Sequence, residues 1–112
     1  MEQAEFEALA SAALEQVQLA LEASGIDADI EAKADGVMEL TFEDRSRMVI
    51  NRHGPARELW VAARSGGFHF RWNGSAWRDT RDGTELFAAL SKLVSAQSGE
   101  PVVLAPRGAP PA

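Results

Sequence analysis

Carboxylates cluster in one short segment of alternating charged and apolar residues. Asp27, Asp29 and Glu31 stand at every second position, Glu22 precedes them closely, and no basic residue stands inside the cluster. In an extended strand, alternate side chains point to the same side about 7 Å apart, so the three carboxylates share one face. Carboxylate oxygens are preferred ligands of hard cations. The segment is therefore a candidate cation site, and a solvated face that only promotes solubility is the alternative.

A large aromatic residue is the second candidate. Trp60 alternates with Leu59 and Val61, so it lies on the opposite face of a strand from those two residues. If Leu59 and Val61 face the core, Trp60 faces solvent, on the side that carries Asn51 and His69. An exposed aromatic residue with such polar neighbours has the composition of a protein-interface hot spot. The alternative is a strand register shifted by one residue, which would bury Trp60.

The other residues that could do chemistry form no recognisable catalytic set. His53 falls in a predicted turn and His69 on a predicted strand, and we interpret both as ordinary surface residues. The chain has no Cys, which excludes disulfides, Cys-type zinc sites, thiol nucleophiles and thiolate-held iron–sulfur clusters. The sequence contains no P-loop, no GxGxxG and no Ser–His–Asp order. We therefore expect no conventional enzymatic catalysis.

The charges are divided unevenly along the 112 residues. Residues 1–44 hold 12 acids and one base, a net charge of −11, whereas residues 45–112 hold 5 acids and 10 bases, a net charge of +5. The pI near 4.8 argues against nucleic acid as a main partner. The longest strictly apolar run is five residues, 59–63, so no membrane span is expected. The acidic N-terminus does not fit a secretory or transit signal, and we expect a cytoplasmic protein.

Periodicity predicts the elements that position these residues. Apolar residues recur at helical spacing over residues 4–24, Gly25 ends the pattern, and Leu19 falls on the polar side. A second helix is expected over residues 84–98. The segment between them changes to a period of two, typical of half-buried strands joined by tight turns. The predicted strands cover residues 26–35, 37–43, 47–52, 57–63 and 68–72, with a short strand around Trp77.

The start and end of the second helix are marked by local signals. Asp82 is expected to be an acidic N-cap, with Glu85 three residues later completing a capping box. Gly99 is the expected end of the helix. Beyond it, the short apolar segment 102–104 is expected to lie against the core.

Consecutive strands with hairpin connections form an antiparallel sheet, and two helices with one apolar stripe each cover one face of it. We therefore expect an α+β fold: a two-layer sandwich, with two helices packed on one face of a five- to six-stranded antiparallel sheet. The expected single domain takes up residues 1–104, and the Pro/Gly-rich tail at residues 105–112 is expected to be disordered. The other face of the sheet is left to solvent or to partners.

Several sequence blocks together resemble bacterial frataxin, the CyaY family. They are INRHGPARELWVAARSGGFHF at residues 50–70, NGSAWRDTRDGTEL at residues 73–86, EFEALA near the start and the acidic DADIE segment. The shared pattern combines NR-x-x-P, W-x-A and GG-F/Y-H-F with an aromatic strand and the D-G start of the last helix. The resemblance covers nearly all of residues 2–104 and implies the frataxin fold.

The resemblance also implies a function. Frataxins are iron-binding accessory proteins of iron–sulfur cluster assembly, which act as iron-responsive regulators of the cysteine desulfurase or as iron donors and also contact the assembly scaffold. Ferrous or ferric iron would be held weakly by an acidic ridge along the first helix and first strand, and the protein is expected to be a monomer. The ridge positions in this sequence are Glu15, Glu22, Asp27, Asp29 and Glu31. The positions that match the family's partner site on the sheet surface are Asn51, Arg52 and Trp60.

The chain departs from the family at the end of the first helix, which is usually richer in acids. Only Glu22 remains there, which shifts the expected iron ligands towards Asp27, Asp29 and Glu31 and makes Leu19 a candidate partner contact. Two alternatives remain open: a protein-interaction module that uses the Trp60 surface and binds metal incidentally, or a weak ferroxidase. The ferroxidase would need preorganised ligands around an open position, which exposed strand carboxylates provide poorly.

Overall fold

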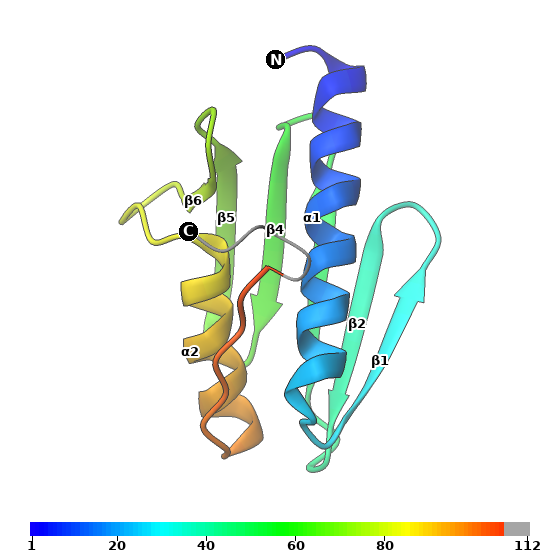
Figure 1. Ribbon diagram of the computed structural model, residues 1–112, viewed down its shortest axis with the longest axis vertical. Helices are drawn as coiled ribbons and strands as arrows, with labels where there is room; N and C mark the ends of the chain where they lie inside the picture. The colour runs from blue at the N-terminus through cyan, green and yellow to red at the C-terminus, as the bar shows by residue number, and fades with distance from the viewer. Residues whose placement is uncertain (107–112) are drawn as a thin grey trace.

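Along the chain, six strands lie between two helices. The computed structural model describes residues 1–106, and the predicted disorder of the tail concerns mostly residues 107–112, which lie outside this part. Each strand pairs antiparallel with the next one in the chain, in the order β1 to β6. Both helices lie on the same face of the sheet (Figure 1), so the predicted two-layer α+β sandwich is confirmed. The elements are α1 (Gln3–Ser24), β1 (Ala28–Lys33), β2 (Val37–Phe42), β3 (Arg47–His53), β4 (Glu58–Ala63), β5 (Gly66–Trp72), β6 (Trp77–Asp79) and α2 (Leu86–Ser98).

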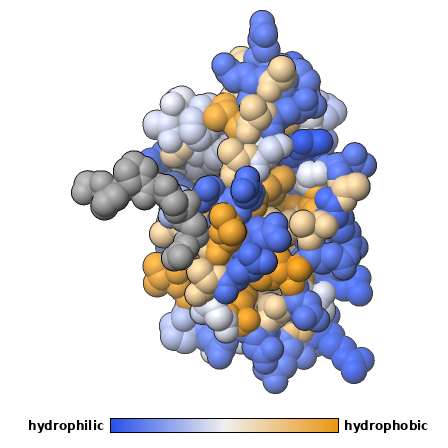
Figure 2. All heavy atoms as spheres, turned by 45° about the vertical axis from the view of Figure 1, so that its right-hand side comes forward, coloured by the Kyte–Doolittle hydropathy of each residue, from blue (hydrophilic) through white to orange (hydrophobic). Residues whose placement is uncertain are grey.

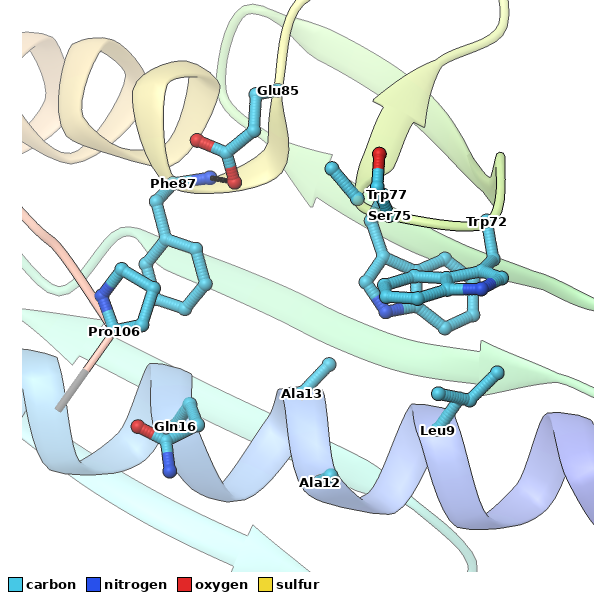
Figure 3. Close-up of a pocket in the computed structure, with 11 residues that line it drawn as sticks. Leu9, Ala12, Ala13, Gln16, Trp72, Ser75, Trp77, Glu85, Phe87 and Pro106 are labelled. Carbon is cyan, nitrogen blue, oxygen red and sulfur yellow. Dashed lines mark hydrogen bonds between the residues drawn. The ribbon is translucent and has the colours of Figure 1, made fainter. Parts of the chain in front are cut away.

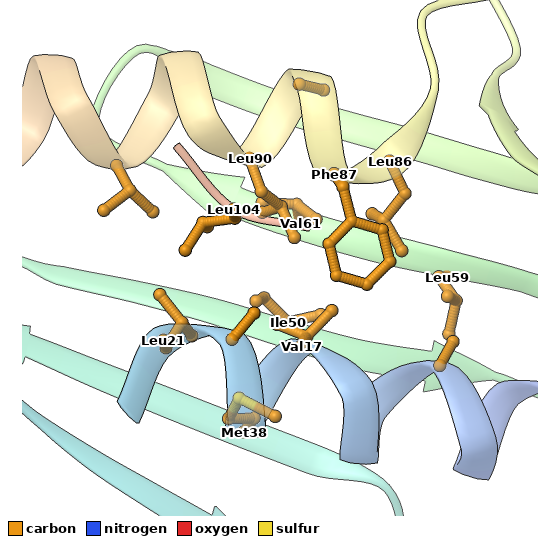
Figure 4. Packing of buried hydrophobic residues seen from close by; sticks show 14 of the residues in the cluster. Val17, Leu21, Met38, Ile50, Leu59, Val61, Leu86, Phe87, Leu90 and Leu104 are labelled. Carbon is orange, nitrogen blue, oxygen red and sulfur yellow. The ribbon is translucent and has the colours of Figure 1, made fainter. Parts of the chain in front are cut away.

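The core lies between the helices and the covered face of the sheet (Figure 4). Alternate residues of β2 to β5 point into it, and the helices add one apolar stripe each. Trp77 of β6 is also buried, at 5% exposure, and packs edge-on against Phe6 of α1. The largest side chains below 2% exposure are Phe6, Val17, Leu21, Leu40, Met48, Ile50, Leu59, Val61, Phe70, Leu86, Leu90 and Val94. We call the opposite, uncovered side of the sheet the open face.

The first hairpin is shorter than the alternation of its sequence predicts. β1 begins at Ala28 and ends at Lys33, which pairs with Val37. Asp35 and Gly36 both adopt positive φ angles, 63° and 72°, in the turn. A Cβ atom on Gly36 would lie 2.6 Å from the Arg52 Cγ, so glycine is required here for space as well as for backbone conformation.

The predicted capping box at the start of α2 is wrong. Asp82 Oδ1 accepts a hydrogen bond from Thr84 N at 2.9 Å in a local turn, and the hydrogen bonds with Thr84 hold the pKa of the Asp82 carboxyl below its usual range. The N-cap is Glu85, whose carboxylate accepts from Phe87 N at 2.8 Å and from Ala88 N at 3.2 Å. The helix therefore starts at Leu86, two residues later than expected, because Glu85 caps it with its own side chain.

The segment after α2 packs against the core as predicted. Val102 and Leu104 are 8% and 4% exposed, whereas Val103 between them is 89% exposed. Two serines of α2 hold this extended segment: Ser95 Oγ accepts from Val102 N, and Ser91 Oγ accepts from Leu104 N, both at 2.8 Å. The segment pairs with no strand among the described residues, and the two serine hydroxyls accept the hydrogen bonds of its backbone N–H groups instead.

Gln97 fastens the end of α2 to two strand connections. It is 7% exposed; its Oε1 accepts from Arg64 N at 3.2 Å, and its Nε2 donates to Ser46 Oγ and to Arg47 O, both at 3.0 Å. A buried polar group that loses its partner costs about 1–3 kcal/mol. We expect Gln97→Met to lower the free energy of unfolding by about that amount in a urea titration. Lys92→Met, at an exposed position of the same helix, is the control, and an equal loss in both variants would contradict this role.

Candidate functional site

The strand carboxylates lie on the open face of the edge strand. Asp29 stands opposite Thr41 and Glu31 opposite Glu39, whereas Ala28 and Ile30 of β1 point towards the core. Asp27, Asp29 and Glu31, which we call the acidic edge, are all exposed. The predicted exposure of all three side chains is therefore confirmed, and Asp29 and Glu31 share the open face of β1. Asp27 lies in a bend just before β1, because the strand begins one residue later.

One base enters the acidic edge, contrary to the expectation that it contains none. Lys33 Nζ lies 3.8 Å from Glu31 Oε1 and 3.3 Å from Glu39 Oε2. The cause is the strand period, which places Lys33 on the same face as Glu31, two residues later. Within residues 1–106, neither Asp27 nor Asp29 forms an ion pair. The free carboxylates of the acidic edge are thus concentrated at its start.

The two helix acids do not join the acidic edge in a closed ligand set. Glu15 lines a hollow of about 230 Å³ between α1 and the first hairpin, together with Lys33 and Arg52, and Glu22 is exposed in the last turn of α1. Among the described residues, no three His, Asp or Glu side chains converge to hold a metal ion. Figure 2, in which this side of the molecule comes forward, shows a mostly hydrophilic surface with apolar side chains gathered in the middle. Such scattered carboxylates bind cations only loosely, with water completing the coordination.

Trp60 is on the open face, as predicted, but it is not freely exposed. It is half-buried between two imidazole rings. The His53 ring stacks on it with centroids 3.7 Å apart and planes within 9°, and the His69 ring stacks on the other face at 4.6 Å and 11°. The interpretation of His53 and His69 as ordinary surface residues is therefore wrong. Cross-strand pairing brings them there, because Trp60 stands opposite His69 on one side, while His53 lies on the neighbouring strand β3 on the other.

A buried carboxylate holds this stack, and sequence reasoning missed it. Glu58 is 5% exposed although it lies on the open face. Its Oε1 accepts from Trp60 Nε1 at 2.9 Å and lies 3.5 Å from His69 Nδ1, and its Oε2 accepts from Arg71 at 2.8 and 3.1 Å. The available signal was the period of two, which places Glu58 on the same face as Trp60. We call His53, Glu58, Trp60, His69 and Arg71 the Trp60 cluster.

The rings of the Trp60 cluster are held in place by their neighbours. The indole N–H is bonded to Glu58, and both indole faces are covered by imidazoles. His53 is itself fixed, because its Nδ1 accepts from Ala56 N at 3.2 Å. A buried charge must be paired and hydrogen-bonded to be tolerated, and Glu58 meets that condition on three sides. The cluster is a preorganised feature of the surface that needs little ordering upon binding.

The structure divides the four predicted partner contacts between two sides of the molecule. Asn51 stands directly opposite Trp60 on the open face. Arg52 points to the helix side, where it donates to Ser11 Oγ of α1 at 3.4 Å. Leu19 is 41% exposed on α1. Asn51 and Trp60 therefore form one surface, and Arg52 and Leu19 do not belong to it.

No helix of the described chain is long and apolar enough to cross a membrane. The sequence model of the frataxin-like domain matches residues 1–100. The chain is 55% identical over 104 residues to the iron–sulfur cluster assembly protein CyaY of Dechloromonas aromatica, covering 93% of this chain and 99% of that protein. It is 52% identical over 107 residues to the protein of the same name from Cupriavidus metallidurans, covering 93% and 96% of the two chains.

Solved structures of frataxins share this fold. The frataxin of Psychromonas ingrahamii superimposes with a TM-score of 0.84 at 32% identity, over 92% of this chain and 97% of that one. The trimeric frataxin of Saccharomyces cerevisiae, solved as a complex with ferrous iron, gives a TM-score of 0.63 at 26% identity, over 89% and 88% of the chains. By domain, sequence and fold, this chain therefore belongs to the frataxin-like family, in the CyaY branch involved in iron–sulfur cluster assembly.

Proposed function

We propose that this protein is an iron-binding accessory protein of iron–sulfur cluster assembly, which docks on the cysteine desulfurase and on the scaffold and responds to or delivers iron. The observation that carries the iron role is the pair of exposed carboxylates of Asp27 and Asp29 at the start of the edge strand, with no ion pair among the described residues. Iron is cargo here, in the ferrous or ferric form, held by carboxylate oxygens and water. The complex of yeast frataxin with ferrous iron supports this role.

The contribution of each acid to iron binding follows from its surroundings. Asp27 and Asp29 form no ion pair with a base among the described residues, whereas Lys33 competes with any cation for Glu31. Glu15 lines its hollow together with the bases Lys33 and Arg52, and Glu22 is exposed in the last turn of α1. We therefore propose Asp27 and Asp29 as the main ligands, with Glu15, Glu22 and Glu31 contributing to the field.

The same acidic surface suits a basic patch on the desulfurase. Complementary charge mainly raises association rate and specificity. Iron bound at the acidic edge would neutralise part of its negative field and so weaken this attraction. This linkage is a physical route by which iron changes the affinity for the desulfurase.

The second candidate function is a protein-interaction module centred on the Trp60 cluster, with incidental metal binding. The stack of His53, Trp60 and His69 over the buried Glu58 favours it, because a rigid aromatic group loses little entropy upon docking. In the first proposal, the Trp60 cluster and Asn51 together form the surface that contacts the scaffold. A ferroxidase is disfavoured, since no convergent set of three ligands occurs in residues 1–106.

Anaerobic titration with ferrous iron, followed by backbone amide signals, tests the iron role. We expect the signals of residues 22–31 to respond at millimolar iron, and the response to be lost in the Asp27→Asn, Asp29→Asn double variant. Lys33→Gln frees Glu31 from its ion pair but should raise the affinity by less than about twofold, because Lys33 stands roughly 13 Å along the strand from Asp29 and its charge is screened over that distance. Glu5→Gln, Glu7→Gln is the control, because it removes the same charge from the start of α1. If residues 22–31 do not respond, the iron role is wrong.

Binding to the purified desulfurase and to the scaffold tests which surface each partner uses. Trp60→Ala should weaken scaffold binding by about 2 kcal/mol, as for a hot-spot residue, and leave the desulfurase affinity nearly unchanged. Asp27→Lys, Asp29→Lys should weaken desulfurase binding and reduce its dependence on salt. Val103→Ala, which truncates an apolar residue that is 89% exposed, is the control. Equal losses for both partners in both variants would show that one surface serves both.

A further inference from the structure

An apolar cavity of about 350 Å³ lies on the helix side, away from the acidic edge and the Trp60 cluster. It is enclosed by α1, the β5–β6 hairpin and the start of α2 (Figure 3). Trp72, Trp77 and Phe87 form its aromatic walls, and the two indole rings lie 5.7 Å apart at 59°. This volume falls at the lower end of the range for small-ligand sites, which suits a single side chain better than an extended peptide.

Two oxygen acceptors stand at this cavity, one from each helix (Figure 3). Gln16 lines it from α1, and its Oε1 is buried without a hydrogen-bond donor among the described residues. Glu85 lines it from the start of α2; each carboxylate oxygen accepts one backbone N–H and retains a second lone pair. The cavity thus combines aromatic surface with acceptors, and an occupant with N–H donors would supply the donor that Gln16 lacks.

The charge around the cavity selects a cation. Glu85 is the one ionisable residue among those that line it. The α1 residues that line the cavity are uncharged, and the four acids of the helix lie outside the lining. Arg78 stands opposite Glu85 in the chain pairing, but its guanidinium donates to Gly83 O. An anionic occupant is disfavoured, and a purely apolar one would leave the Gln16 acceptor without a donor. The four acids of α1 are Glu5, Glu7, Glu15 and Glu22.

We propose that this cavity binds an arginine side chain presented by a basic segment of a partner protein. A guanidinium is planar, carries five N–H donors, stacks on aromatic rings and is weakly hydrated. It would lie against the aromatic wall and donate to Gln16, the acceptor that lacks a donor, or to Glu85. A lysine ammonium has a compact charge and no planar face, so it fits this combination less well. The proposal is independent of iron binding.

The test compares blocked tripeptides Gly-Arg-Gly and Gly-citrulline-Gly, because citrulline has the shape of arginine without its charge. Each is titrated into the full chain while the indole N–H signals of Trp72 and Trp77 and the amide signal of Gln16 are followed by NMR. We expect the arginine peptide to shift these signals and the citrulline peptide to bind about fivefold more weakly, as for loss of an exposed cation–aromatic contact. A lysine tripeptide should fall between the two.

Variants of the cavity test whether the arginine peptide binds there. Ala12→Phe fills the exposed edge of the cavity and should abolish the shifts, whereas Ala8→Phe, exposed on the same helix but outside the lining, should not. Glu85→Gln keeps an oxygen for the α2 cap and should reduce the preference for arginine over citrulline. Circular dichroism checks that each variant folds.

Three results would overturn the proposal. They are no shift with the arginine peptide, equal binding of arginine and citrulline, or binding that persists in Ala12→Phe. Loss of binding in Asp27→Asn, Asp29→Asn would also overturn it, because the peptide would then lie on the acidic edge.

Discussion

Burial on one side only is the constraint on which this structure depends. Two helices cover one face of the six-stranded sheet, so every strand must place apolar side chains on that face at alternate positions. The side chains at the intervening positions do not pack in the core, and they include the candidate functional groups. The acidic edge and the Trp60 cluster both lie at such positions, and both are aligned by the same period of two that builds the core.

The open face is not simply a solvated surface, because it contains a buried carboxylate. Glu58 is 5% exposed and is paired with Arg71 and bonded to the Trp60 indole. Removing an ionised group from water is costly unless it is paired and hydrogen-bonded. The result is a fixed stack of aromatic rings on the open face of the sheet, which is ordered without a partner. By contrast, the acidic edge is exposed, and neither Asp27 nor Asp29 forms an ion pair among the described residues.

The uneven division of charge along the chain becomes a division between surfaces. Seven of the 12 acids of residues 1–44 lie on α1 or in the acidic edge, and the other five lie before α1, in turns or on β2. The only base among those residues, Lys33, pairs with Glu31 and Glu39. Negative charge stands in two separate places: the acidic edge, and the cavity beside Trp72 and Trp77, where Glu85 supplies it. The first suits a hard cation or a basic patch, and the second suits a planar cation because aromatic rings line it.

The sequence alone determined the two-layer fold, the strand order, the exposure of Asp27 and Asp29 and the outward position of Trp60, because these follow from local periodicity. It placed the α2 cap at Asp82 because a local motif does not reveal which carboxylate reaches the helix N–H groups. Only the tertiary structure decided which contacts form between strands and helices: the pairing of Lys33 with Glu39, the burial of Glu58 among Trp60 and Arg71, and the contact of Arg52 with α1. These depend on register and on packing between distant segments, which side-chain types and spacing along one chain do not specify.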